Sequence, residues 1–117
     1  MWIEKLAEKL RATLETMLGV AVPAAEVRVW GYAWGDIYSG GGYTDVIAFE
    51  RPPLKIEFTF AFHELSGQCD GWKLRIDHAR PDQVQTLREV FSPAQYTGHW
   101  RNGETPVVIV DGVEQRL

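Results

Sequence analysis

Four residues are the best candidates for metal binding in this sequence: His63, Cys69, Asp70 and His78. His63 and Cys69 flank a predicted turn, and His78 follows the strand that returns from it, so the hairpin could bring them near one another. Zinc sites favour tight ligand pairs such as Cys-x-x-Cys or His-x-x-x-His, and neither occurs here. We therefore expect no metal and no cofactor.

Acid–base catalysis would depend on His63 or His78. Asp77 directly precedes His78, but adjacent strand residues face opposite ways and cannot form an orienting pair. His63 could instead meet a carboxylate such as Glu57 or Asp77. The candidate nucleophiles lack the flanking residues of a hydrolase motif; they are Cys69, Ser39 and Ser66. The two histidines are thus weak catalytic candidates, and we expect a non-enzymatic protein.

The glycine triplet after Ser39, at residues 40–42, resembles a phosphate-binding loop in composition alone. Such loops bind phosphate because their N–H groups point at the anion from the start of a helix. This triplet joins two predicted strands, and no Gly-Lys-Ser/Thr follows it. The pattern therefore predicts a hairpin turn and no nucleotide.

The aromatic face of residues 27–38 is the most informative feature. Alternation places the rings on one side and small residues on the other. If a helix packs on the small side, the rings line an open surface for a partner; if the rings are core, the glycines face outward. The first interpretation predicts a binding surface of Trp30, Tyr32, Trp34, Asp36 and Tyr38.

Carboxylates are concentrated in and near the predicted sheet. If they share a face with the aromatic side chains, the result is an acidic and aromatic surface. Such a surface would suit a basic protein partner, because aromatic side chains anchor interfaces and charges steer the encounter. The carboxylates concerned are Asp36, Asp45, Glu50, Glu57 and Glu64.

The elements that must position these residues follow from hydrophobic periodicity. Residues 2–18 read as an amphipathic helix with a stripe from Ile3 to Met17, ended by Gly19. Strands are predicted over residues 27–38, 43–49, 54–65 and 72–77, with a break at 51–53 and a turn at 66–71. Their short connections make them antiparallel neighbours.

Pro81 opens a second helix, whose buried stripe is Val84, Leu87, Val90 and Phe91. Two dipeptides that favour type I′ turns follow it. The dipeptide at 102–103 would join a strand at 96–101 to one at 106–110, and the dipeptide at 111–112 would lead into a strand at 113–116. The whole chain, 1–117, is predicted to be one α+β domain. Its mainly antiparallel sheet has about six strands, with one or both helices on its apolar face.

Composition narrows the class of partner. The net charge of −4 weighs against nucleic acid, because phosphate neutralisation needs a basic face. A single cysteine and no secretory signal favour a cytoplasmic protein. The longest apolar run falls far short of the ~20 residues that span a bilayer, so we expect no membrane partner.

Three functions follow from these observations. The leading hypothesis is a protein-binding or inhibitory module of bacterial or phage type, which holds a protein partner or a second copy of itself. The alternative is a small-molecule pocket between sheet and helices, with His63 or His78 as acid or base. A third, a local nucleic-acid face, requires four basic residues to converge; they are Arg28, Lys73, Arg75 and Arg88.

Overall fold

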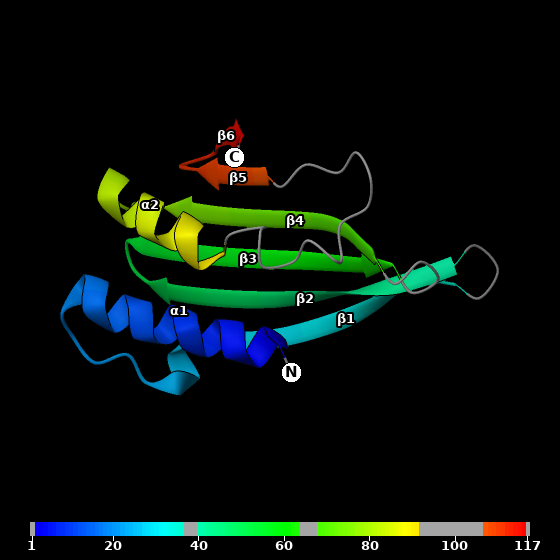
Figure 1. Ribbon diagram of the computed structural model, residues 1–117, viewed down its shortest axis with the longest axis horizontal. Helices are drawn as coiled ribbons and strands as arrows, with labels where there is room; N and C mark the ends of the chain where they lie inside the picture. The colour runs from blue at the N-terminus through cyan, green and yellow to red at the C-terminus, as the bar shows by residue number, and fades with distance from the viewer. Residues whose placement is uncertain (1, 37–39, 64–67, 92–106, 117) are drawn as a thin grey trace.

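The computed structural model describes residues 2–36, 40–63, 68–91 and 107–116. Its strands form one sheet in the order β1-β2-β3-β4-β5-β6, and both helices lie against the same face (Figure 1). This arrangement confirms the predicted α+β class. The elements are α1 (Trp2–Leu18), a 3₁₀ turn η1 (Ala24–Glu26), β1 (Arg28–Asp36), β2 (Gly40–Arg51), β3 (Leu54–His63), β4 (Gln68–Asp77), α2 (Pro81–Val90), β5 (Val107–Val110) and β6 (Val113–Arg116).

Helix α1 has the predicted bounds and the predicted apolar stripe. Leu10 and Leu14 are fully buried, and Ile3 and Leu6 are nearly so. Gly19 ends the helix with φ at 69°, a left-handed value that glycine adopts without strain. Its N–H still donates to the Glu15 carbonyl at 2.9 Å.

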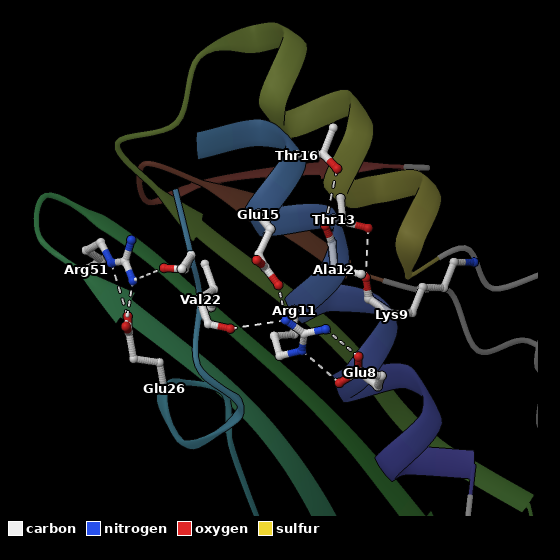
Figure 2. Close-up of polar contacts among 11 residues, drawn as sticks. Glu8, Lys9, Arg11, Ala12, Thr13, Glu15, Thr16, Val22, Glu26 and Arg51 are labelled. Carbon is white, nitrogen blue, oxygen red and sulfur yellow. Dashed lines mark hydrogen bonds and ion pairs between the residues drawn. The ribbon is translucent and has the colours of Figure 1, made fainter. Parts of the chain in front are cut away.

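Arg11 fastens α1 to the chain that follows it (Figure 2). Its guanidinium donates to both carboxylate oxygens of Glu8 at 2.6 and 2.8 Å, to the Glu15 carboxylate, and to the Val22 carbonyl at 3.2 Å. The hydrogen bonds from Arg11 lower the pKa of Glu8. The carboxylates in turn raise the pKa of Arg11 above its usual value.

Arg51, at the end of β2, holds the same connection from the other side (Figure 2). It donates to the two carboxylate oxygens of Glu26 at 2.5 and 3.1 Å and to the Ala21 carbonyl at 3.2 Å. The fork of a guanidinium matches a carboxylate in this two-point geometry. The segment between α1 and β1 is therefore tied to both α1 and β2, which positions the start of β1.

The core lies between the helices and one face of the sheet. The predicted stripe of β3 faces it, with Ile56 and Phe58 fully buried. Phe58 stacks on Phe91 at the end of α2, with ring centroids 4.6 Å apart, and meets Trp72 of β4 edge-on at 5.3 Å. The predicted stripe of α2 also faces this core, with Leu87 and Val90 buried.

Two strands are longer than the sequence predicted. β2 begins at Gly40 rather than Tyr43, so the glycine triplet is part of the strand and not a free reversal. A Cβ on Gly41 would lie 2.6 Å from the Trp34 carbonyl oxygen, so the close approach of the strands needs glycine there. β4 begins at Gln68 rather than Trp72, and a bulge near Asp70 lets this polar segment pair with β3 despite its lack of apolar alternation.

The C-terminal strands close the sheet in a way that hairpins alone did not predict. β5 pairs in parallel with β4, because α2 intervenes and carries the chain back across the core. The predicted turn at 111–112 is confirmed, with φ at 48° for Asp111 and 80° for Gly112. The predicted hairpin at 102–103 and its strand at 96–101 lie outside the described residues. No helix among the described residues is long and apolar enough to cross a membrane.

Candidate binding face

The aromatic residues of β1 lie on the face of the sheet opposite the helices. In the register of β1 and β2, Val29 pairs with Ile47 of the helix-covered core, so Trp30 and Tyr32 project from the other side. Trp30 is 42% exposed and Tyr32 is 55% exposed, while Trp34 is half-buried. Of the two interpretations of this strand, the structure therefore supports the one with outward rings. No described helix or strand covers this side, which we call the open face.

The glycine side of β1 differs from what was expected. Gly31 and Ala33 are exposed, so no described helix packs closely on them. A Cβ on Gly31 would instead lie 3.0 Å from an Asp45 carboxylate oxygen, so glycine makes room for that side chain. Asp45 thus lies on the helix side of the sheet, away from the aromatic rings of β1. Partial burial raises the pKa of Asp45, because desolvation disfavours its charged form.

The open face contains a hollow of about 470 Å³ beside the aromatic strand. Its floor is made of small side chains on the middle strands: Thr44 of β2, Thr59 and Ala61 of β3, and Gly71 of β4. Tyr32 stands on one side, and Lys73 and Val107 stand on the other, with Glu57 also in the lining. Tall side chains at the edges and short ones in the middle therefore produce the concavity.

The charge of the open face is mixed rather than acidic. Arg28, Ala48, Glu57 and Arg75 form one row across four strands, so Glu57 lies directly opposite Arg75 on β4, and Arg28 stands two strands away on the other side. Glu50 and Glu57 do share this face with the aromatic side chains, but Asp45 does not, and basic residues lie among them, so the surface is not the acidic one expected. Among the side chains that the structure describes, the charged residues on this face are Arg28, Lys55, Lys73 and Arg75 against Glu50, Glu57 and Asp77.

Three of the four residues of the predicted basic cluster share a face of the sheet, but they do not form a cluster. Arg28, Lys73 and Arg75 share the open face, but Arg28 stands on β1 and the other two on β4, three strands away. The Arg28 guanidinium lies over the Trp30 ring, 5.6 Å from its centroid. Arg88 lies on α2, on the other side of the sheet. These four residues therefore do not converge on one site.

The two catalytic candidates are far apart. His63 pairs with Gln68 at one end of the β3–β4 hairpin, while His78 follows Asp77, which pairs with Lys55 at the other end. Lys55 and His63 are eight steps apart along β3, or ~26 Å at the usual rise. The hairpin does place His63 and Cys69 at the same end, but His78 lies at the other end, so the expectation that all three come together is wrong. The described residues contain no group of three metal-ligating side chains.

His78 is exposed, and its backbone helps to hold the fold together. Its φ is 61°, and its backbone N–H donates to a carboxylate oxygen of Asp111 at 2.7 Å. Asp36 pairs through its backbone with Gly40 at the end of β1. The predicted site residue Tyr38 lies outside the described residues, as do the side chains of Asp36 and His63.

Several lining residues of the hollow were not predicted. Thr59, Ala61 and Gly71 are small, and small residues carry little signal of a site unless the strand register is known. Val107 reaches the hollow only because α2 returns the chain to pair β5 with β4. Lys73 was expected in a nucleic-acid face, and it stands instead beside the hollow.

Comparison with known proteins identifies no relative. No family model matches the chain, and no curated protein or solved structure matches it significantly. The geometry of the open face is therefore the basis on which a function can be proposed.

Proposed function

We propose that this protein is a non-enzymatic protein-binding or inhibitory module, and that the open face holds a segment of another protein. The observation that carries the proposal is the exposure of Trp30 and Tyr32, 42% and 55%, beside a hollow of about 470 Å³. Exposed aromatic side chains on a rigid strand are the usual anchors of protein interfaces. An apolar patch of this kind on a folded domain is typical of an interaction site.

The hollow suits a partner that inserts an apolar side chain among polar neighbours. Its floor of threonine, alanine and glycine leaves room for that side chain, and Tyr32 offers a ring to pack against. Lys73 and Glu57 bring both signs of charge to the lining. We therefore expect a partner segment with mixed charges rather than a purely basic one.

A small-molecule pocket is the second candidate, and the volume of the hollow favours it. Among the side chains that the structure describes, the lining includes no histidine, and the acid or base candidates in it are Glu57, Lys73 and Tyr32. His78 does not belong to the lining, and the side chain of His63 lies outside the described residues. Protein binding is the better-supported function, because exposed rings extend beyond the hollow along β1.

The test uses the immobilised full chain to capture partners from a lysate of the source cells. We expect Trp30→Ala and Tyr32→Ala each to reduce the captured partner by about tenfold or more. Tyr43→Ala is the matched control, because Tyr43 is also an aromatic side chain of the sheet, is 41% exposed, and lies on the helix side. Equal capture by all variants would overturn the proposal.

A second variant tests the hollow itself. A Cβ on Gly71 would meet only the Ala61 Cβ, at 3.8 Å, so Gly71→Val adds bulk to the floor without a backbone clash. We expect this variant to fold and to lose the partner. If Gly71→Val captures the partner as the wild type does while Trp30→Ala does not, the rings alone form the interface.

A further inference from the structure

β1 is an edge strand that lacks the usual protection of an edge. It pairs with β2 on one side, and no described strand pairs with its other side. Natural proteins blunt such edges with proline, with lysine, or with very short strands. β6, the opposite edge, is only four residues long, whereas β1 has nine residues, contains no proline and is charged only at its two ends, Arg28 and Asp36.

β1 is also exposed on both of its faces. Val29 is 40% exposed on the helix side, and Trp30 and Tyr32 are exposed on the open side. Gly31, Ala33 and Gly35 are exposed as well. Six large apolar side chains are exposed among the described residues, and three of them, Val29, Trp30 and Tyr32, lie on β1. A strand with this composition is suited to burial along its edge.

We propose that two copies of this chain join edge to edge through antiparallel pairing of β1, centred on Tyr32, into one continuous sheet. In this register Arg28 of one copy falls opposite position 36 of the other, which is an aspartate. Trp30 falls opposite Trp34, and Tyr32 falls opposite itself. Cross-strand pairs of opposite charge and of aromatic rings both stabilise antiparallel sheets.

The sequence of β1 selects this register over its neighbours. A shift of two residues in one direction sets Trp30 opposite Asp36, and a shift in the other sets Arg28 opposite Trp34, so the charge pair is lost either way. Parallel pairing in register would set Arg28 opposite Arg28 and Asp36 opposite Asp36. Like charges directly opposite each other destabilise a sheet. The centred antiparallel register is also the one in which all nine residues of the two strands overlap.

The small side chains fit the same pairing. Gly31 falls opposite Ala33, and Val29 falls opposite Gly35, so each pair on the helix side includes a glycine. The pairing uses the main chain of the β1 edge, whereas the described lining of the hollow comes from β2 to β5, apart from Tyr32. It therefore goes beyond the proposed function, and either can fail without the other. If both hold, the two hollows flank one shared ridge of aromatic rings.

Covalent trapping tests the register. Residues directly opposite in an antiparallel pair have Cα atoms about 4.5–5.5 Å apart, within the disulfide range of about 4.4–6.8 Å. Tyr32→Cys should therefore form a covalent dimer under mild oxidation. Trp30→Cys is the matched control, because its two copies would lie ~13 Å apart along the strands. The wild-type chain is the second control, because any disulfide-linked dimer that it forms must be linked through Cys69.

Equal cross-linking by Tyr32→Cys, Trp30→Cys and the wild type would overturn the proposed register. The oligomeric state tests the pairing itself. Sedimentation of the unmodified chain, from micromolar to submillimolar concentration, should show a monomer–dimer equilibrium. Tyr32→Lys should raise the dimer dissociation constant by about tenfold or more, because it replaces a ring pair with like charges. Val20→Lys is the control, since Val20 is 51% exposed and lies outside the sheet.

A charge exchange distinguishes this interface from any other. Arg28→Asp and Asp36→Arg should each weaken the dimer, and the double variant should restore it to within about threefold of the wild type, because the opposite-charge pairs re-form. Circular dichroism confirms that each variant folds. A monomer at every concentration, or a dimer that none of the β1 substitutions weakens, would overturn the proposal.

Discussion

The Asp111 side chain caps the backbone of His78, a residue 33 positions earlier in the chain. One carboxylate oxygen of Asp111 accepts the His78 N–H at 2.7 Å, and the Asp111 N–H donates to the Ile76 carbonyl at 3.0 Å. Both residues are in the left-handed region, with φ at 61° and 48°. The turn between β5 and β6 is thereby fixed to the end of β4, which aligns the parallel pair.

Removing this cap should weaken the fold. Asp111→Ala deletes the acceptor and places a side chain that disfavours positive φ in the turn, so we expect a loss of about 1–2 kcal/mol in the free energy of unfolding. Asp111→Asn keeps an acceptor and tolerates the conformation, and should cost less than about 0.5 kcal/mol. Urea unfolding followed by tryptophan fluorescence measures both. Equal losses would mean that the negative charge, not the hydrogen bond, is what matters.

His78 should be replaceable with a gain in stability. A non-glycine residue at φ 61° is strained, and His78 is exposed, so burial of its side chain does little to offset the strain. We expect His78→Gly to raise the free energy of unfolding by about 0.5 kcal/mol, net of the entropy that glycine adds to the unfolded chain. His78→Ala keeps the strain and should change stability little. Thermal unfolding of the three proteins compares them; a less stable glycine variant would contradict the prediction.

The Asp45 carboxylate should cost stability at neutral pH. Its folded-state pKa is raised by desolvation above the ordinary value of 3.8, so the penalty is present above the folded pKa and disappears as the pH falls towards 3.8. Asp45→Asn should therefore be more stable than the wild type at neutral pH. The difference should shrink in acid, where both side chains are neutral. Urea unfolding at the two pH values measures it, and a difference that does not change with pH would refute this cause.

The Glu26–Arg51 pair should show measurable coupling. Both side chains are 34% exposed, and two hydrogen bonds join them. A double-mutant cycle with Glu26→Ala and Arg51→Ala should give about 0.5–1 kcal/mol of coupling. Arg51→Lys should recover only part of it, because an ammonium cannot form the two-point contact. A coupling indistinguishable from zero would show that the segment before β1 is held by other contacts.

Two glycines of the sheet should respond differently to alanine. Gly35 has φ at 85°, and a Cβ there would lie 2.6 Å from the Gly40 carbonyl oxygen. Gly35→Ala should therefore cost about 2 kcal/mol or more. Gly71→Ala meets only an ordinary contact and should change stability by less than about 0.5 kcal/mol. Similar unfolding midpoints for the two variants would show that β1 relaxes around residue 35.

The helices and the central strand were predictable because each has one buried face. Ile56 and Phe58 alternate with polar residues, and Leu10 and Leu14 recur at helical spacing, so burial and period agree. The orientation of β1 was not predictable in this way. Either the aromatic or the small residues of β1 could face the core. The register decides, because Val29, which is on the same side as the small residues, pairs with the core residue Ile47 of β2.

The hollow could not be predicted from the sequence for a similar reason. Its residues come from four adjacent strands and from β5, so the site exists only once register and strand order are known. A one-residue shift would reverse every face of a strand. The bulge near Asp70 changes the register near the start of β4, where the residue types predict only a turn.

The long connection between β4 and β5 affects the order in which the strands fold. β1 to β4 are joined by segments of two to four residues, whereas β5 meets β4 only after residues 78–106 have been crossed. Closing a longer loop costs more entropy before any contact offsets it. We therefore expect the first four strands to assemble early and the C-terminal hairpin to dock last. The edge of β4 would then be open in the final folding step, when the chain is most exposed to the wrong strand partner.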